Sequence, residues 1–454
     1  MRTELKKTYL TLLCGLIGSL SFCQVQLPNT PTPSTFQTIT PNQYMPENVI
    51  PMPNVPTVTN FGQDRIRQQN RQLIAEVERN EQLRRQQQNQ MYRDVAEFNK
   101  GRINYSLPSH AGKQGASHFR KAFDQLNETD FNNYSVKDLT FLVENTFYED
   151  ELDKAEFYEI IANIGKFLTT KMDELGYDKK SNSAKNFMIF QFFSERLELK
   201  NGTEHLPFEY DFEDYMGIQD YSKMFVTKLL KTQTGQCHSM PLLYLIVAEE
   251  IGAEAYLAYS PNHSYIRFLA DNGKWYNIEL TNGMFSTSSY ILQSGFVKSE
   301  ALLNKIYMQN LSDKELMAQF YTDLTNAYIA KYGYDDFVGN VVSKALELYP
   351  NSISANMIKA NLLTMEFEYV CNQVGINPRN KQELQNIRYY PKVVEMLNAV
   401  NAQYATIDNL GYTHMPAEAY QDWLQSMKKQ ESLQENQKIN EQFKGLLNKQ
   451  PIKN

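Results

Sequence analysis

The run Leu242–Ala248 constrains the fold of this chain more than any other stretch, because it is apolar around its whole circumference when written as a helix. Such a helix must be buried in the core of a domain. Pro241 is tolerated in the first turn, where backbone N–H groups have no partner inside the helix, and Gly252 is a typical terminator. Three segments with strand character follow, at Ala255–Tyr259, His263–Leu269 and Lys274–Leu280. The sequence therefore predicts an α+β fold.

Helical periodicity dominates the rest of the folded chain. Before the strands we expect helices at Asp138–Glu149, Glu156–Leu175, Lys185–Leu197 and Met224–Leu230. After them we expect helices at Ala301–Met308, Asp313–Lys331, Asp335–Tyr349 and Ser352–Val370, with further helices between residues 393 and 431. The turn Tyr349-Pro350-Asn351-Ser352 is similar to the end of a tetratricopeptide repeat, so we expect a region that resembles helical repeats and could bind a protein partner.

Length and charge limit the function classes. A chain of 454 residues has room for two or three domains with cores of their own. The net charge of -7 is mild and spread out, which argues against nucleic-acid binding and against a basic membrane patch. No nucleotide-binding or metal-binding motif is recognisable, so we expect no cofactor and no metal.

The N-terminus has the pattern of a secretory signal peptide at residues 1–23. A basic start precedes the apolar run Tyr9–Leu20, which is short for a membrane span. We expect cleavage after Cys23 and an exported, periplasmic or extracellular protein without an integral membrane span. A lipid anchor on Cys23 is the alternative, although Phe22 is bulky for such a site.

Composition divides the remainder into regions. A Pro-rich segment is predicted to be a disordered linker, and a Gln/Arg-rich segment is predicted to be a solvated helix packed on one side, with a coiled coil as the alternative. The predicted regions are the linker 24–60, the Gln/Arg-rich helix 61–100, the α+β domain 103–300, the helical region 301–430 and a polar tail 431–454.

Three side chains have the order of a thiol enzyme. Cys237 precedes the buried helix, whose N-terminus favours a thiolate because free N–H groups and the helix dipole attract negative charge. His263 opens the second strand, where it could serve as general base. Glu279 lies on the third strand and could orient the imidazole.

The hairpin between the last two strands decides whether these groups meet. A two-residue loop would put Glu279 and His263 on opposite faces of the sheet. A three-residue loop, Asp271-Asn272-Gly273 with Gly273 left-handed, places His263 opposite Thr281. Glu279 then lies on the same face as His263, one diagonal step away.

The motifs Gly235-Gln236-Cys237, His263 before a strand, and Trp275-x-x-x-Glu279-x-Thr281 resemble the transglutaminase-like superfamily, whose core is papain-like. The resemblance covers roughly residues 185 to 290. It implies a thiol enzyme that acts on amide or peptide bonds through a thioester, with water or an amine as acceptor. Glu279 stands where that family has Asp, and Asn277 is the alternative partner of the histidine.

Other residues near the cysteine are weaker candidates. Gln233 and Gln236 could donate to an oxyanion, and His238 is expected to line the cleft. Two alternatives remain open. Cys237 could form a disulfide with Cys371, or the chain could be a catalytically inactive envelope scaffold that keeps the fold without the chemistry.

Overall fold

The computed structural model describes residues 61–286, 288–430, 441 and 444–445. The predicted signal peptide, the predicted Pro-rich linker and most of the predicted polar tail lie outside these residues. The described chain forms two compact units. The first unit comprises Pro108–Leu362 and the residues from Gln403 onward, and the second comprises the residues up to Leu107 together with Leu363–Ala402.

The first unit is built around a four-stranded antiparallel sheet of consecutive strands. Its strands are β5 (Tyr256–Ser260), β6 (His263–Leu269), β7 (Trp275–Glu279) and β8 (Met284–Ser286). In the β6–β7 hairpin Leu269 pairs with Trp275 and Ile266 with Ile278. Gly273 has a φ of 77°, and its N–H donates to Ala270 over 2.8 Å. The predicted three-residue loop and its register are therefore confirmed.

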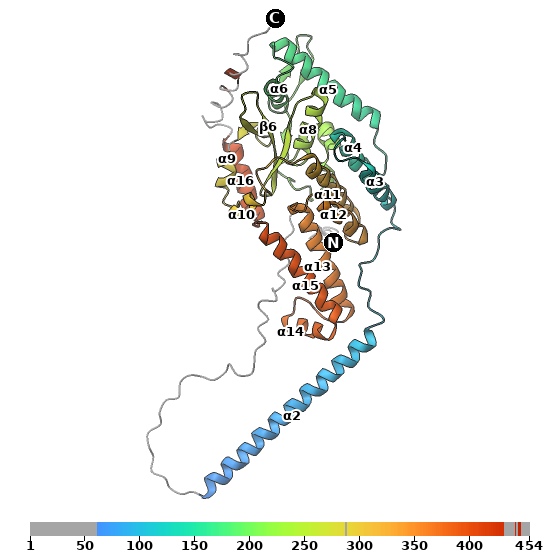
Figure 1. Ribbon diagram of the computed structural model, residues 1–454, viewed down its shortest axis with the longest axis vertical. Coiled ribbons are helices and arrows are strands. Elements are labelled where there is room, and N and C mark those ends of the chain that lie inside the picture. Colours follow the sequence, from blue (N-terminus) through green and yellow to red (C-terminus); the bar gives the residue numbers. More distant parts are fainter. Residues whose placement is uncertain (1–60, 287, 431–440, 442–443, 446–454) are drawn as a thin grey trace, which may run out of the picture. The chain divides into compact units, whose positions relative to one another are not determined.

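Helix α8 (Ser239–Ile251) is the central helix of this unit (Figure 1). It packs against β5 and β6 as well as against the helices on its other sides. All its residues from Ser239 to Ala248 are buried, as an all-round apolar helix requires. Gly252 ends it with a φ of 66°, and its N–H is shared between the carbonyls of Ala248 and Glu249.

Helices that precede the sheet in the sequence and helices that follow it complete the first unit. The N-terminal ones are α3 (Ala116–Glu128), α4 (Val136–Phe147), α5 (Lys154–Leu175), α6 (Asn182–Ser194) and α7 (Val226–Thr232). After the sheet come α9 (Ser288–Gln293), α10 (Ser299–Leu303), α11 (Asp313–Tyr332), α12 (Asp336–Leu348), the first part of α13 (Ile353–Gln373), the last part of α15 (Pro391–Asn409) and α16 (Ala417–Gln430). Helix α11 packs against α12, α3 and α4. The α+β class is thus the observed one.

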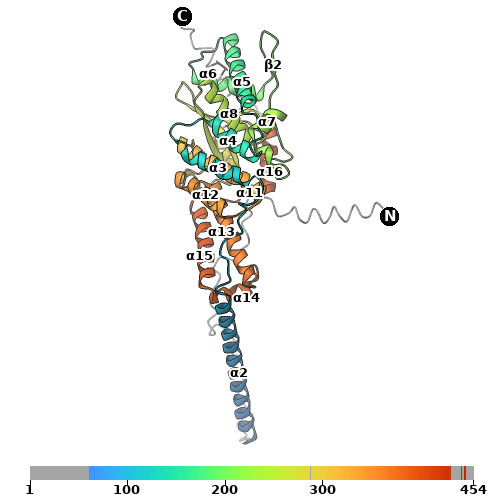
Figure 2. The same ribbon diagram turned by 90° about the vertical axis from the view of Figure 1, so that its right-hand side faces the viewer.

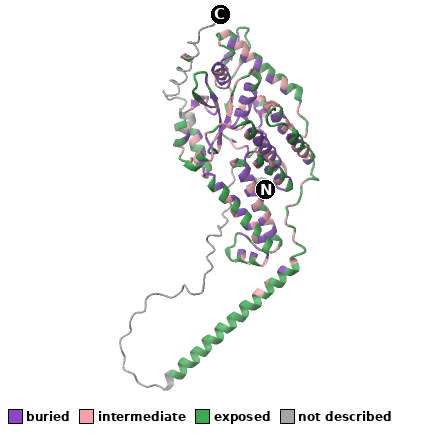
Figure 3. Ribbon diagram, in the orientation of Figure 1, coloured by how far each residue is buried: buried purple, intermediate pink, exposed green. Residues whose placement is uncertain are grey.

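The second unit contains the long helix α2 (Phe61–Asn99), which is uninterrupted in Figures 1 and 2. Residues 64–88 are exposed throughout (Figure 3). The prediction of a helix packed along one side is therefore wrong over this length. Near its end, Tyr92 stacks on Tyr389 of the 3-10 helix η3 (Gln385–Tyr389), with ring centroids 5.5 Å apart. The short helix α14 (Lys381–Leu384) precedes η3. No helix in the described part of the chain is both long and apolar enough to cross a membrane.

Candidate active site

Cys237 lies just before α8, held by a short parallel bridge. Strand β4 (Thr234–Gly235) pairs with β3 (Glu209–Tyr210), with Tyr210 opposite Gly235. Gly235 is required by packing, since a Cβ there would lie 2.8 Å from a methyl carbon of Leu229. The carbonyl of Cys237 accepts a hydrogen bond from the Ser264 hydroxyl on β6. The loop that carries the thiol is therefore fixed to the sheet and to the helix.

His263 and Glu279 form a buried pair on one face of the sheet. The Nε2 of His263 is 2.8 Å from Oε2 of Glu279. The other carboxylate oxygen accepts the backbone N–H of Thr281 over 3.0 Å. His263 and Glu279 are only 4% and 5% exposed. Because Nε2 contacts Glu279, Nδ1 is the ring nitrogen that can interact with the thiol.

A tyrosine from the end of the chain links the imidazole to the thiol. The hydroxyl oxygen of Tyr420, on α16, lies 3.2 Å from Nδ1 of His263 and donates to Sγ of Cys237 over 3.7 Å. Trp423, one turn later, meets the imidazole edge to face at a centroid distance of 5.0 Å. A continuous path of polar contacts thus runs from Glu279 through His263 and Tyr420 to Cys237.

The electrostatics favour a thiolate beside an imidazolium. Burial raises the pKa of the Cys237 thiol, but the hydrogen bond and charge of His263 outweigh it, so that the pKa lies below its usual value. Burial acts to lower the pKa of His263, but the charge of Glu279 and the contact with Cys237 raise it to about 10. Tyr210, held next to the thiol, has a pKa raised by burial and then by the charge of Cys237.

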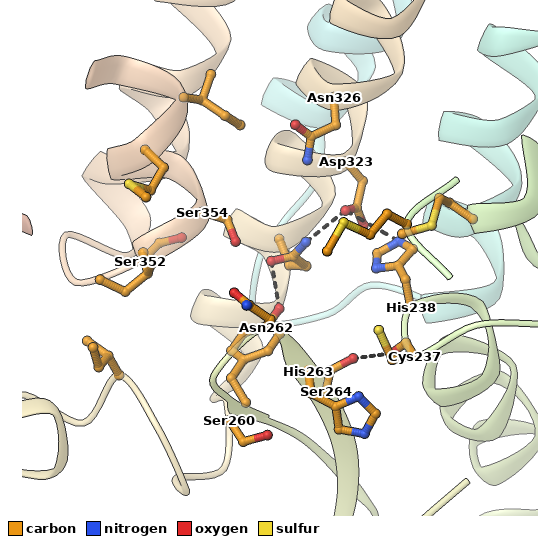
Figure 4. A pocket seen from close by; sticks show the side chains of 18 of the residues that line it. Cys237, His238, Ser260, Asn262, His263, Ser264, Asp323, Asn326, Ser352 and Ser354 are labelled. Atoms are coloured by element: carbon orange, nitrogen blue, oxygen red, sulfur yellow. Dashed lines mark hydrogen bonds and ion pairs between the residues drawn. The ribbon is translucent and has the colours of Figure 1, made fainter. Parts of the chain in front are cut away.

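A cavity of about 230 Å³ opens beside the thiol. Figure 4 shows Cys237 and His263 near each other, with His238 above Cys237 and Asp323 above His238. His238 lines this cavity as predicted, and its Nε2 is 3.5 Å from Oδ1 of Asp323 on α11. The cavity is shared by the start of α8, the start of β6 and the helices that follow the sheet.

No relative is available to transfer a role to these residues. No family model, no curated protein and no solved structure matches this chain. Any assignment of function therefore rests on the side-chain geometry.

The remaining candidate residues lie elsewhere. Gln233 is exposed and left-handed, with a φ of 57°, and does not line the cavity. The side-chain amide of Gln236 is fully buried and donates to the carbonyl of Asp214. Asn277 accepts a hydrogen bond from Arg267 over 3.1 Å. Neither glutamine is placed to donate to an oxyanion, and Glu279, not Asn277, is the partner of His263.

The two cysteines of the described chain are both free thiols. Cys237 is half-buried and Cys371 is buried. Burial raises the pKa of the Cys371 thiol to about 12, the opposite direction to Cys237. Among the described residues, no three His, Cys, Asp or Glu side chains come together as a group that could hold a metal ion.

Sequence reasoning missed Tyr420 and Tyr210. Tyr420 is 157 residues from His263 in sequence, and Tyr210 belongs to a strand of only two residues. Neither has a local pattern that separates it from the other tyrosines of a chain that has 29 of them.

Proposed function

We propose that this chain is an exported thiol enzyme of the transglutaminase-like superfamily that cleaves or transfers an acyl group at an amide or peptide bond. The observation that carries the proposal is the buried Cys237–His263–Glu279 arrangement, with the cysteine at the N-terminus of a buried helix. The packing of α8 on a small antiparallel sheet supports a papain-like core. The successive helices α11, α12 and α13 support a repeat-like region that binds protein partners.

The thiolate of Cys237 attacks the carbonyl carbon, and the imidazolium of His263 gives its proton to the departing amine. A thioester forms as the amide C–N bond breaks. Water or a second amine then attacks the thioester, His263 takes the proton of that nucleophile, and the thiolate leaves. Glu279 holds the imidazole in orientation and stabilises its positive charge throughout.

The oxyanion is assigned to backbone donors. Met240 already donates its N–H to the carbonyl of Gln236 over 3.1 Å and Pro241 has none, so the proposed donors are the backbone N–H groups of His238 and Ser239, next to Cys237. The hydroxyl of Tyr420, already within 3.7 Å of Sγ, is a second donor at this position.

The test is the pH dependence of iodoacetamide alkylation of Cys237, followed by mass spectrometry. A thiolate–imidazolium pair should label rapidly well below pH 8.5, the ordinary thiol pKa. The imidazolium is lost as the pH rises through the His263 pKa of about 10, so the pair exists from the lowered pKa of Cys237 up to about pH 10. In His263→Ala the low-pH labelling should fall by about tenfold or more.

His118→Ala is the matched control, because His118 pairs with Asp150 and does not line the cavity. It should leave the profile unchanged. An ordinary thiol profile in the wild type, insensitive to His263→Ala, would rule out the enzyme.

That outcome would favour the inactive scaffold. One observation already supports this second candidate. Tyr420 and Trp423 pack on His263, and the Tyr420 hydroxyl contacts both the imidazole and the thiol. In a scaffold these contacts are permanent, whereas in an enzyme the Tyr420 hydroxyl must release His263 and Cys237 and turn to the bound substrate.

A further inference from the structure

The cavity beside Cys237 is built for part of a substrate. Its volume of about 230 Å³ is below the roughly 300–1,000 Å³ of pockets that enclose a whole small ligand. A single side chain or one end of a larger molecule fits such a space. Among the described residues that line it, Asp323 is the sole carboxylate, and none is a lysine or an arginine.

Asp323 has one oxygen without a hydrogen-bond partner. Its Oδ1 accepts a hydrogen bond from Gln319 over 2.7 Å and faces His238, whereas Oδ2 has no partner among the described residues. The residue is only 7% exposed. A buried carboxylate oxygen that is not hydrogen-bonded is costly, and a small rotation of this side chain toward the cavity would let an ammonium group pair with it.

A second buried carboxylate, Glu144, interacts with Asp323. Glu144 is buried, and its two oxygens accept the backbone N–H groups of Val226 and Thr227 over 2.7 and 2.8 Å. Burial raises the pKa of Glu144 to about 7, and the charge of Asp323 adds to the increase. Within the described chain neither carboxylate has an ion pair with lysine or arginine. Burial raises the pKa of Asp323, whereas the charge of His238, 3.5 Å away, acts to lower it.

The walls of the cavity suit a cation. The lining includes the aromatic residues Tyr259, Tyr307, Tyr334, Tyr349 and Tyr412. Aromatic faces attract ammonium groups through their quadrupole, and hydroxyl groups accept their hydrogen bonds. Among the described lining residues the basic side chains are His238 and His263, and the imidazolium of His263 is already paired with Glu279.

We propose that this cavity binds a primary ammonium group of the substrate through Asp323, and thereby places a neighbouring carbonyl at Cys237. The attack on that carbonyl rests on the proposed function, but the ammonium site does not. The ammonium is that of a lysine-like side chain or of a free amino terminus. Asp323 is a specificity residue, separated from the thiol by His238.

The test measures how three small amides slow iodoacetamide alkylation of Cys237 in the full chain. Nα-acetyl-lysine amide carries a side-chain ammonium, norleucine amide a free amino terminus, and Nα-acetyl-norleucine amide neither. At least one of the two cationic compounds should slow the alkylation of Cys237 at concentrations about tenfold lower than the neutral compound requires. The compound that protects better identifies the source of the ammonium.

In Asp323→Asn, which keeps the shape and the contact with Gln319, this tenfold preference should disappear. Asn326→Lys is the second variant, because Asn326 also lines the cavity one turn away on α11 and a lysine there would supply the cation internally. It should abolish selective protection without removing the carboxylate. Asp408→Asn is the control, an exposed position outside the cavity.

Equal protection by all three compounds, no protection by any of them, or a preference that survives Asp323→Asn would each overturn the ammonium site. These outcomes are independent of the proposed function. Iodoacetamide also alkylates an ordinary thiol, so an ordinary pH profile with selective protection would reject the enzyme and keep the site.

Discussion

At the scale of single residues, Glu279 fixes the position of the imidazole because its two oxygens have different partners. One oxygen contacts Nε2 of His263, and the other accepts the backbone N–H of Thr281 in the turn that follows β7. The longer glutamate side chain thus reaches across the hairpin diagonal while it stays anchored to its own strand. The replacement of the expected Asp by Glu is compatible with a tight contact of 2.8 Å.

Glu279→Gln should make Cys237 less reactive. The Glu279 charge is the largest cause that raises the pKa of His263, so its removal lowers that pKa and destabilises the thiolate beside it. A shift of one unit corresponds to about 1.4 kcal/mol, so alkylation at pH 6–7 should slow by about tenfold. Alkylation kinetics followed by mass spectrometry measure this.

The matched control is Asn277→Ala on the same strand, where the side chain contacts Arg267. It should leave the Cys237 profile unchanged. An unaltered profile in Glu279→Gln would show that the carboxylate does not act on the thiol through His263.

Local signals sufficed to predict which side chains meet at the sheet. The position of Cys237 follows from the buried helix after it, and the contact of His263 with Glu279 follows from the length of the hairpin loop. Tyr420 could not be predicted, because its position depends on packing between segments 157 residues apart. Gln236 was misjudged because a polar residue near a thiol can equally be a buried structural donor.

At the scale of elements, the β3–β4 bridge is the least regular support of the site. Each strand has two residues, and the pairing is parallel. Gly235 lets Leu229, Met240 and Ser239 approach so closely that a Cβ would lie 2.8 to 3.0 Å from them. Close packing here sets the position of the residue that carries the thiol two places later.

Gly235→Ala should therefore destabilise the first unit by about 1–3 kcal/mol, the usual cost of an overpacked core. Urea unfolding followed by tryptophan fluorescence suits this test, because the chain has 2 tryptophans, Trp275 and Trp423, and both belong to that unit. Gly112→Ala, with no atom within 4 Å of the added carbon, should leave the midpoint unchanged. Equal midpoints for the two variants would contradict the packing argument.

The elements that were predicted well have strong periodicity of their own. The strand His263–Leu269 was predicted to the residue, and α5, α11 and α12 to within two residues at each end. Strand β8 was missed because it has only three residues, and α3 was missed because its buried face is formed by a few residues between polar ones. Such short elements are ordered by the neighbours on which they pack.

At the scale of the whole molecule, the exposed part of α2 should be dispensable for the first unit. Residues 64–88 are all exposed, and α2 belongs to the second unit. Deletion of residues 1–88 should leave the tryptophan-detected urea midpoint and the alkylation profile of Cys237 unchanged. A lower midpoint, or slower alkylation, would show that the exposed segment stabilises the site.

The first unit is discontinuous in sequence, since residues 363–402 separate α16 from the rest of it. This matters during synthesis. His263 leaves the ribosome 157 residues before Tyr420, a delay of roughly 8–30 s at about 5–20 residues per second. Until α16 emerges, the imidazole lacks both Tyr420 and Trp423. The nascent chain therefore carries Cys237, His263 and Glu279 before the two aromatic side chains that pack on the imidazole have been made.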